Sequence, residues 1–129
     1  NQQAIRDGLA AVKLAGRFDV RMIDERLWVF DVAHNKAGVS FLMSQFIAFW
    51  RINHSRQLHV VFSMLADKDI DGVLSVFCEY HLPVKTWHIA PLDNSRSMTA
   101  EAIFHKLSSV VDSKIYSHQD IAQATKRFI

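Results

Sequence analysis

Residues able to handle phosphates and nucleotides lie at the two ends of one short stretch, GRFDVRMIDERLWVFDVAHN, residues 16–35. Arg17 stands near its beginning, and Asp31, His34 and Asn35 lie together at its end. A strand that runs into the first turn of a helix presents free backbone N–H groups and a partial positive charge, which attract phosphate or carboxylate. A carboxylate and an imidazole at that point can bind ribose hydroxyls, phosphate or the water on a bound cation. The alternative stays open: Asn35 caps the helix, and Asp31 binds backbone.

A second polar group follows the next two predicted strands. Asp67, Lys68 and Asp69 form a triplet of mixed charge, and Arg96 closes the segment Asp93-Asn94-Ser95-Arg96. A guanidinium suits bidentate capture of a carboxylate. The alternatives are a solvated triplet in which one aspartate caps a helix, and an ordinary surface arginine.

Several kinds of site are excluded by pattern. The chain contains no GxGxxG, no GxxxxGK[ST] and no GxSxG, so neither a dinucleotide fingerprint, a phosphate-cradling P-loop nor a nucleophile elbow is present. Cys78 falls within a helical pattern and has no nucleophile partners. No histidines are spaced as metal ligands and no CxxC supports them, so we expect no metal site in this chain. The histidines are His34, His54, His59, His81, His88, His105 and His118.

Strand and helix patterns alternate along the chain from residue 27 onward. This order predicts right-handed crossovers and a Rossmann-like α/β fold, with a mostly parallel sheet and helices on both faces. A first strand, joined to residues 27–32 by a tight turn at 24–26, would add an antiparallel edge. The strand at 27–32 is nearly all apolar, which is typical of burial on both faces. We expect strands at 18–23, 27–32, 58–64, 86–90 and 114–116, and helices at 4–12, 36–52, 70–77, 99–111 and 117–128.

Helix starts are marked by capping residues. Asp67 or Asp69 would cap the helix at 70–77, Thr99 the following one, and Ser117 the last. In sheets of this kind ligands bind at the carboxyl ends of the strands. The loops there are 33–36, 65–69 and 91–96, and they hold most of the polar residues singled out above.

Composition sets the broad class. The chain has 129 residues, half of them hydrophobic, which suits one domain with a real core. Its 15 basic and 13 acidic residues leave a net charge of +2 without a basic run, so we expect no nucleic-acid partner. We also expect no membrane association, since no apolar run is long enough for a span. The single Cys78 fits a reducing, cytoplasmic setting.

Four motifs in register resemble one family over nearly the whole chain. Gly16-Arg17-Phe18, Asp31-Val-Ala-His34-Asn35, Leu65-Ala-Asp-Lys-Asp69 and Ala90-Pro91 through Arg96 are similar to the C-terminal domain of bacterial bifunctional dihydrofolate synthase/folylpolyglutamate synthase, a relative of the Mur ligases. The departures are Ala15 and Lys36 where the family usually has proline, and Asp19 where it has glutamine. None of these changes removes a ligand.

The resemblance implies an ATP-dependent ligase that adds L-glutamate to dihydropteroate and to folates through an acyl phosphate, with ATP and Mg²⁺ as cofactors. Its ligands for Mg²⁺ and its P-loop would lie in an N-terminal domain, so this chain would hold no metal itself. Carried over by position, the resemblance assigns nucleotide contacts, a catalytic residue and glutamate contacts. These are Arg17, Asp31 and Asn35 for ATP, His34 for catalysis, and Asp67, Lys68 and Arg96 for glutamate.

On the same resemblance, residues 1–15 would be the tail of an N-terminal ATPase domain with its linker. Residues 16–129 would be the Mur ligase-type C-terminal domain, truncated at its end. We expect such a fragment to be inactive alone, to be monomeric and to need its own N-terminal P-loop domain as partner. The alternative is a stand-alone α/β binding or interaction module without catalysis.

Overall fold

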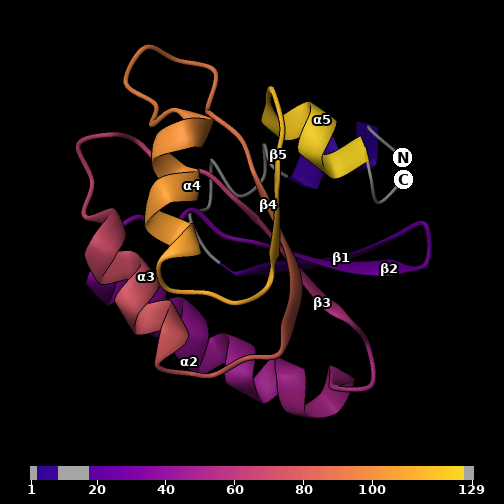
Figure 1. The fold of residues 1–129 in the computed structure, drawn as a ribbon. Coiled ribbons are helices and arrows are strands. Elements are labelled where there is room, and N and C mark those ends of the chain that lie inside the picture. Colours follow the sequence, from indigo (N-terminus) through magenta and orange to yellow (C-terminus); the bar gives the residue numbers. More distant parts are fainter. Residues whose placement is uncertain (1–2, 9–17, 127–129) are drawn as a thin grey trace.

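The computed structural model describes residues 3–8 and 18–126 of the chain (Figure 1). Residues 3–8 are helical, so the helix expected at 4–12 is confirmed as far as residue 8, and its remainder lies outside the described residues. The labelled elements are β1 (Asp19–Ile23), β2 (Arg26–Phe30), α2 (Lys36–Asn53), β3 (Leu58–Phe62), α3 (Ile70–Cys78), β4 (Val84–Ile89), α4 (Ala100–Ser108), β5 (Lys114–Ser117) and α5 (Ile121–Lys126).

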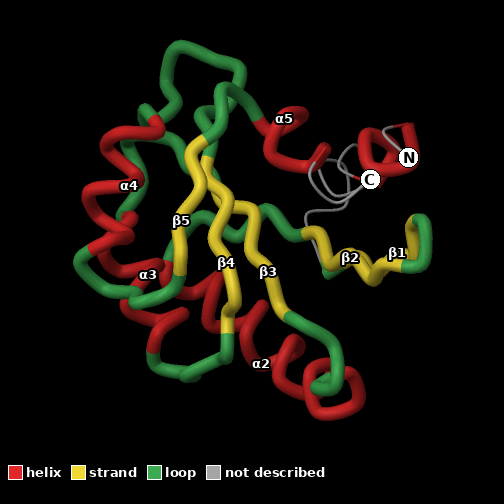
Figure 2. The backbone as a smooth tube through the Cα atoms, turned by 45° about the vertical axis from the view of Figure 1, so that its right-hand side comes forward, coloured by secondary structure: helices red, strands yellow, loops and turns green. Residues whose placement is uncertain are grey.

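The central sheet is parallel and has the order β3-β4-β5. Its two crossovers, α3 and α4, advance in the same direction across the sheet, and right-handed connections therefore place both helices on one face. Helix α2 packs beside α3 on that side, whereas α5 lies on the other side and contacts β3 and β4 (Figure 2). The predicted α/β class, with a parallel sheet and helices on both faces, is confirmed.

The main core lies between this sheet and α2, α3 and α4. Trp87 of β4 is 2% exposed and is its centre: its ring meets Phe77 edge-on at 5.1 Å and Phe62 at 6.1 Å between centroids. The alternating side-chain directions of the strands put every second residue on this face. The buried members of the core are Val39, Met43, Met64, Ile70, Val73, Leu74, Trp87, Ile89, Ile103 and Leu107.

Strands β1 and β2 form a hairpin, as the alternating pattern and the polar turn predict. Asp24 and Glu25 have φ of 50° and 66°, the left-handed conformation that a two-residue hairpin turn needs. One detail differs from expectation: the hairpin is a sheet of its own and not the antiparallel edge of the parallel sheet. Only Phe30 of β2 is buried, because the hairpin packs on a small separate cluster with Ile5 and Ile23.

The helix starts show how local sequence sets the element boundaries. Side-chain oxygens of Asp69 and Thr99 accept the amides of Gly72 and Ala102 at 3.0 Å and 3.1 Å, which confirms these two caps. The expectation for α5 was wrong: Ser117 ends β5, and Asp120 accepts the Gln123 amide at 2.7 Å. A carboxylate three residues before that amide has the cap geometry, whereas Ser117 continues the strand pairing with Ile89.

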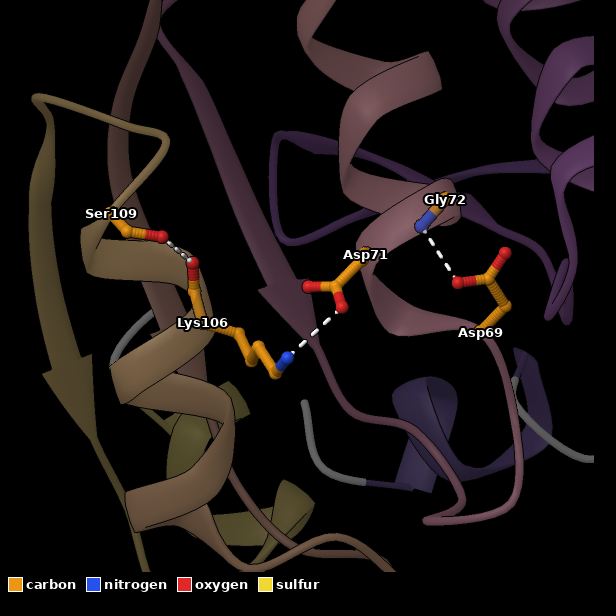
Figure 3. A network of polar contacts seen from close by, with 5 residues as sticks. All are labelled: Asp69, Asp71, Gly72, Lys106 and Ser109. Atoms are coloured by element: carbon orange, nitrogen blue, oxygen red, sulfur yellow. Dashed lines mark hydrogen bonds and ion pairs between the residues drawn. The ribbon is translucent and has the colours of Figure 1, made fainter.

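An ion pair ties the two crossover helices together. Lys106 Nζ of α4 lies 2.9 Å from Asp71 Oδ2 of α3, and Figure 3 shows this contact beside the Asp69 cap. The capping carboxylate and the Asp71 carboxylate therefore use different partners at the start of α3. None of the helices in the described part of the chain combines the length and the apolar content that a membrane span requires.

Candidate functional site

The loop between β2 and α2 borders an open hollow of about 210 Å³. Small-molecule sites commonly enclose about 300–1,000 Å³. This hollow is too small and too open to enclose a nucleotide, so it suits one wall of a larger site. It is lined by Asp31, Val32, Ala33, His34, Asn35, Gly38 and Phe41, and thus gathers three of the predicted site residues.

Asp31 is held by the backbone that follows it. Its Oδ1 accepts a hydrogen bond from the Ala33 amide at 2.8 Å, which confirms the alternative in which Asp31 binds backbone. Partial burial raises the pKa of the Asp31 carboxyl, and backbone amides of Ala33 and Val32 oppose that rise. A carboxylate that is partly stripped of water and fixed in direction is a good acceptor for a pair of hydroxyl groups.

His34 has a defined tautomer. Its Nδ1 lies 3.1 Å from the carbonyl oxygen of Val32, and a carbonyl only accepts, so Nδ1 carries the hydrogen. Nε2 is then an acceptor in the neutral ring and a donor in the charged ring. Because the side chain is exposed, Nε2 can meet a ligand in either state.

Asn35 is the N-cap of α2. Its Oδ1 accepts the Gly38 amide at 2.8 Å, with extended backbone at φ −143° and ψ 172°. The other amides of the first turn have no intrahelical partner and face outward with the positive end of the helix dipole. Two exposed apolar side chains, Val32 and Phe41, border the same hollow.

The second group of predicted residues is also assembled. Arg96 Nη2 lies 3.2 Å from Asp67 Oδ2, joining the loops after β3 and β4. The backbones are paired as well, with the Ala66 amide donating to the Arg96 carbonyl at 2.8 Å. Arg96 therefore already holds one carboxylate, through a single exposed contact. Lys68 lies between this pair and the α3 cap, and Arg17 lies outside the described residues.

Lys36 connects the two groups. A β-carbon added at Gly72 would lie 2.7 Å from Lys36 Cδ and 2.3 Å from Asp69 Oδ2. The lysine stem from the start of α2 thus lies against the first turn of α3. Lys36 is where the resemblance leads one to expect proline, and here it packs the two strand-end loops together.

A larger hollow of about 450 Å³ runs along the outside of α4 and contains none of the predicted site residues. The described part of the chain also has no group of three side chains placed to hold a metal ion. One polar cluster was not predicted from the spacing of residues in the sequence. It lies on the face of the parallel sheet opposite the main core. It consists of His59, Thr86, His88 and His118.

Comparison with known families gives one match over most of the chain. The model of the family described as Mur ligase, glutamate ligase domain, matches residues 16–129. Among curated proteins, the dihydrofolate synthase/folylpolyglutamate synthase of Escherichia coli K12 is 35% identical over 84% of this chain and 24% of its own length. That of Haemophilus influenzae is 27% identical over 84% of this chain and 28% of its own length. The chain spans about a quarter of these relatives.

Solved structures show the same similarity. The E. coli FolC complex with DHPP and ADP superposes with a TM-score of 0.69 at 33% identity, covering 98% of this chain and 28% of that one. The bifunctional folylpolyglutamate synthase/dihydrofolate synthase of Yersinia pestis, complexed with AMPPNP and a Mn ion, superposes with a TM-score of 0.66 at 30% identity. The match covers 99% of this chain and 28% of that one. In both, the aligned region is about a quarter of the solved chain.

Proposed function

The chain belongs to the Mur ligase family as a glutamate ligase domain, and from this we propose that it is the C-terminal lobe of an ATP-dependent ligase. The full enzyme would add L-glutamate to dihydropteroate and to folates through an acyl-phosphate intermediate. The relatives that support this substrate class are dihydrofolate synthase/folylpolyglutamate synthases, and each is about three to three and a half times as long as this chain.

The observation that carries the proposal is the hollow at the start of α2. It combines the fixed Asp31 carboxylate, the accessible Nε2 of His34 and the free amides of a helix N-terminus, in a space too small for a nucleotide. These are the groups that contact ribose and phosphate. An open wall of this kind fits a site that a second domain completes.

The described residues have roles that their geometry allows, and Arg17 keeps the role that the resemblance implies. Asp31 accepts hydrogen bonds from the ribose hydroxyls, and Arg17 is assigned to the phosphates from the linker. Asn35 fixes the first turn of α2, so that its backbone amides face the nucleotide. His34 lies beside the point where phosphate and the incoming amine meet, and is our candidate for a catalytic contact.

The reaction needs two displacements. The substrate carboxylate attacks the γ-phosphorus of ATP and ADP leaves; the glutamate amine then attacks the acyl carbon and inorganic phosphate leaves. Little covalent chemistry falls to the protein, so positioning and charge stabilisation account for most of the rate. Glutamate would be oriented by the second group, in which Arg96 receives a carboxylate beside Asp67, with Lys68 nearby.

Mg²⁺ would offset charge on the ATP phosphates. Among the described residues, the only carboxylate at the hollow is that of Asp31, which we assign to the ribose, so the hollow offers no separate protein ligand for Mg²⁺. We assign the protein ligands of Mg²⁺ to an N-terminal P-loop domain, which is also the proposed partner of this lobe. We further propose a cytoplasmic, monomeric enzyme.

The test compares two proteins: the product of the complete reading frame and the 129-residue chain. With ATP, Mg²⁺, dihydropteroate and glutamate, the first should release ADP only when both acceptor substrates are present, and the second should release none. Dihydropteroate-dependent ADP release from the 129-residue chain would contradict the two-domain site. A complete protein that folds and binds ligand without any turnover would favour the binding module instead.

A further inference from the structure

The hollow at the start of α2 has an apolar side that the roles assigned so far do not use. Phe41 of α2 borders the hollow and is 64% exposed. Val32, in the loop after β2, borders it as well and is 40% exposed, and Ala33 lies between the two in the lining. Single exposed apolar side chains are ordinary, whereas adjoining ones at a hollow are typical of a binding surface.

The packing of α2 does not account for Phe41. Val39 and Met43, two residues before and two residues after it, are both buried in the main core. Two residues correspond to about 200° around an α-helix, so Phe41 lies on the side of α2 that faces away from this core. Further along the helix, Phe46 stacks on Trp50 at 6.2 Å between ring centroids. Within the described part of the chain, no aromatic ring pairs with Phe41 in this way.

The polar side of the hollow determines where the parts of a nucleotide would lie. On the proposed function, the Asp31 carboxylate receives the ribose hydroxyls, and the backbone amides that follow Asn35 face the phosphates. The base is bonded to the same ribose ring as these hydroxyls, so it must lie directly beside them. Val32 follows Asp31 in the chain and Phe41 borders the same hollow, so the apolar side is within reach of that base.

We propose that Phe41, with Val32 beside it, is the surface on which the base of the bound nucleotide stacks. This contact rests on the proposed function, because the ribose and phosphate contacts set the position of the base. Every nucleobase has a flat π face, and an aromatic side chain covers that face without hydrogen bonds. Phe41 is therefore a binding residue that adds affinity for ATP and takes no part in the chemical steps.

Steady-state kinetics of the complete protein test this contact. Phe41→Ser removes the ring and should raise KM for ATP by about 5- to 150-fold, the effect of losing one stack between a base and an aromatic ring. Phe41→Tyr keeps the ring and should keep the parental KM for ATP. In both variants kcat at saturating ATP and KM for dihydropteroate should stay constant. The matched control is Phe104→Ser, at an exposed phenylalanine of α4 outside this hollow, and it should leave all three constants unchanged.

The outcomes separate this contact from the proposed function. An unchanged KM for ATP in Phe41→Ser would overturn the base contact. If Asp31→Asn still weakened ATP binding, the proposed ATP wall would stand without it; if neither variant did, the proposed function of the hollow would fail too. A rise in KM for dihydropteroate in place of KM for ATP would put the acceptor substrate at Phe41. A fall in kcat alone would assign the ring to contact with the second domain. Either result would contradict the proposal.

Calorimetry with ADP gives a measurement that does not depend on turnover. Kd for ADP should rise in Phe41→Ser by the same factor as KM for ATP, and it should keep the parental value in Phe41→Tyr. An unchanged Kd for ADP in Phe41→Ser would contradict the base contact. Should Phe41→Ser not fold, Phe41→Leu takes its place with the same expectation, because leucine is a good helix former without a ring.

Discussion

The stem of Lys36 lies against Gly72, where even one added β-carbon would come within 2.7 Å of the lysine Cδ. This contact joins the start of α2, which borders the Asp31 hollow, to the start of α3, which follows Asp67 and Lys68. The two groups of predicted site residues are therefore held by one packed junction. Its rigidity matters because ligand contacts displaced by even 1 Å lose much of their effect.

Replacing Gly72 by alanine should destabilise the chain. In an open helix position this change would gain about 1 kcal/mol, but here the methyl group meets Lys36 and the capping Asp69, and overpacking costs about 1–3 kcal/mol. Urea unfolding measures the difference. The matched control is Ser75→Ala, at an exposed position of the same helix. In a Lys36→Ala background the cost of Gly72→Ala should shrink, and an undiminished cost would rule out the lysine contact as its cause.

Two substitutions of Asn35 separate its capping role from its proposed role in binding the nucleotide. Asn35→Ala loses the bond to the Gly38 amide and should cost about 1 kcal/mol of unfolding free energy. Asn35→Asp keeps the cap and should keep the stability, yet it places a negative charge beside the nucleotide phosphates. We expect calorimetry on the complete protein to give weaker ADP binding for Asn35→Asp. Unchanged ADP affinity would leave Asn35 with a capping role alone.

Asp31 should limit stability at neutral pH. Burial raises the pKa of its carboxyl, so the folded chain binds this proton more tightly than the unfolded chain does. The Asp31 carboxyl therefore contributes most to the free energy of unfolding at acid pH, where it is protonated. This contribution is lost as the pH rises above the ordinary carboxyl pKa of about 4. Asn in place of Asp31 can still accept the Ala33 amide. The urea midpoint of Asp31→Asn relative to the parent should thus rise from pH 4 to pH 7, and a difference independent of pH would contradict the burial effect.

Arg96→Ala should separate glutamate binding from stability. The pair with Asp67 is exposed on both sides, so its loss should change unfolding free energy by no more than about 1 kcal/mol. A hydrogen bond to a charged ligand group is stronger, about 1.5–3 kcal/mol, which corresponds to a rise in KM for glutamate of roughly 10- to 150-fold. KM for ATP should stay constant. An unaltered KM for glutamate in the complete protein would remove Arg96 from the site.

Periodicity and capping chemistry were enough to predict most elements. The apolar spacing of α2, the Asp69 and Thr99 caps and the polar strand-end loops all depend on residues within a few positions of one another. Those features persist in the fold because local preference and tertiary packing agree. The position of Asp31, His34 and Asn35 together at the strand-to-helix loop was predictable for the same reason.

Features that depend on partners far along the chain were not predictable in this way. An alternating strand pattern does not state which strand it pairs with, so the separate β1–β2 sheet was missed. The contact of His88 with His118 and that of Lys36 with Gly72 arise from strand register and helix packing. Position-by-position spacing could not reveal either. The sequence did hold one signal for His88. It follows Trp87 in a predicted strand, so its side chain points to the opposite face of the sheet.

We propose that the hollow at Asp31 is one wall of an ATP site that a second domain completes. The measurement is kcat/KM for ATP in the complete protein carrying Asp31→Asn. The control is Asp112→Asn, at an exposed aspartate in the loop before β5. Asp31→Asn should lower kcat/KM for ATP at least about tenfold, the loss of one charged hydrogen bond, and Asp112→Asn should leave it unchanged. Equal kcat/KM values for Asp31→Asn and the parent protein would show that the Asp31 carboxylate does not bind ATP.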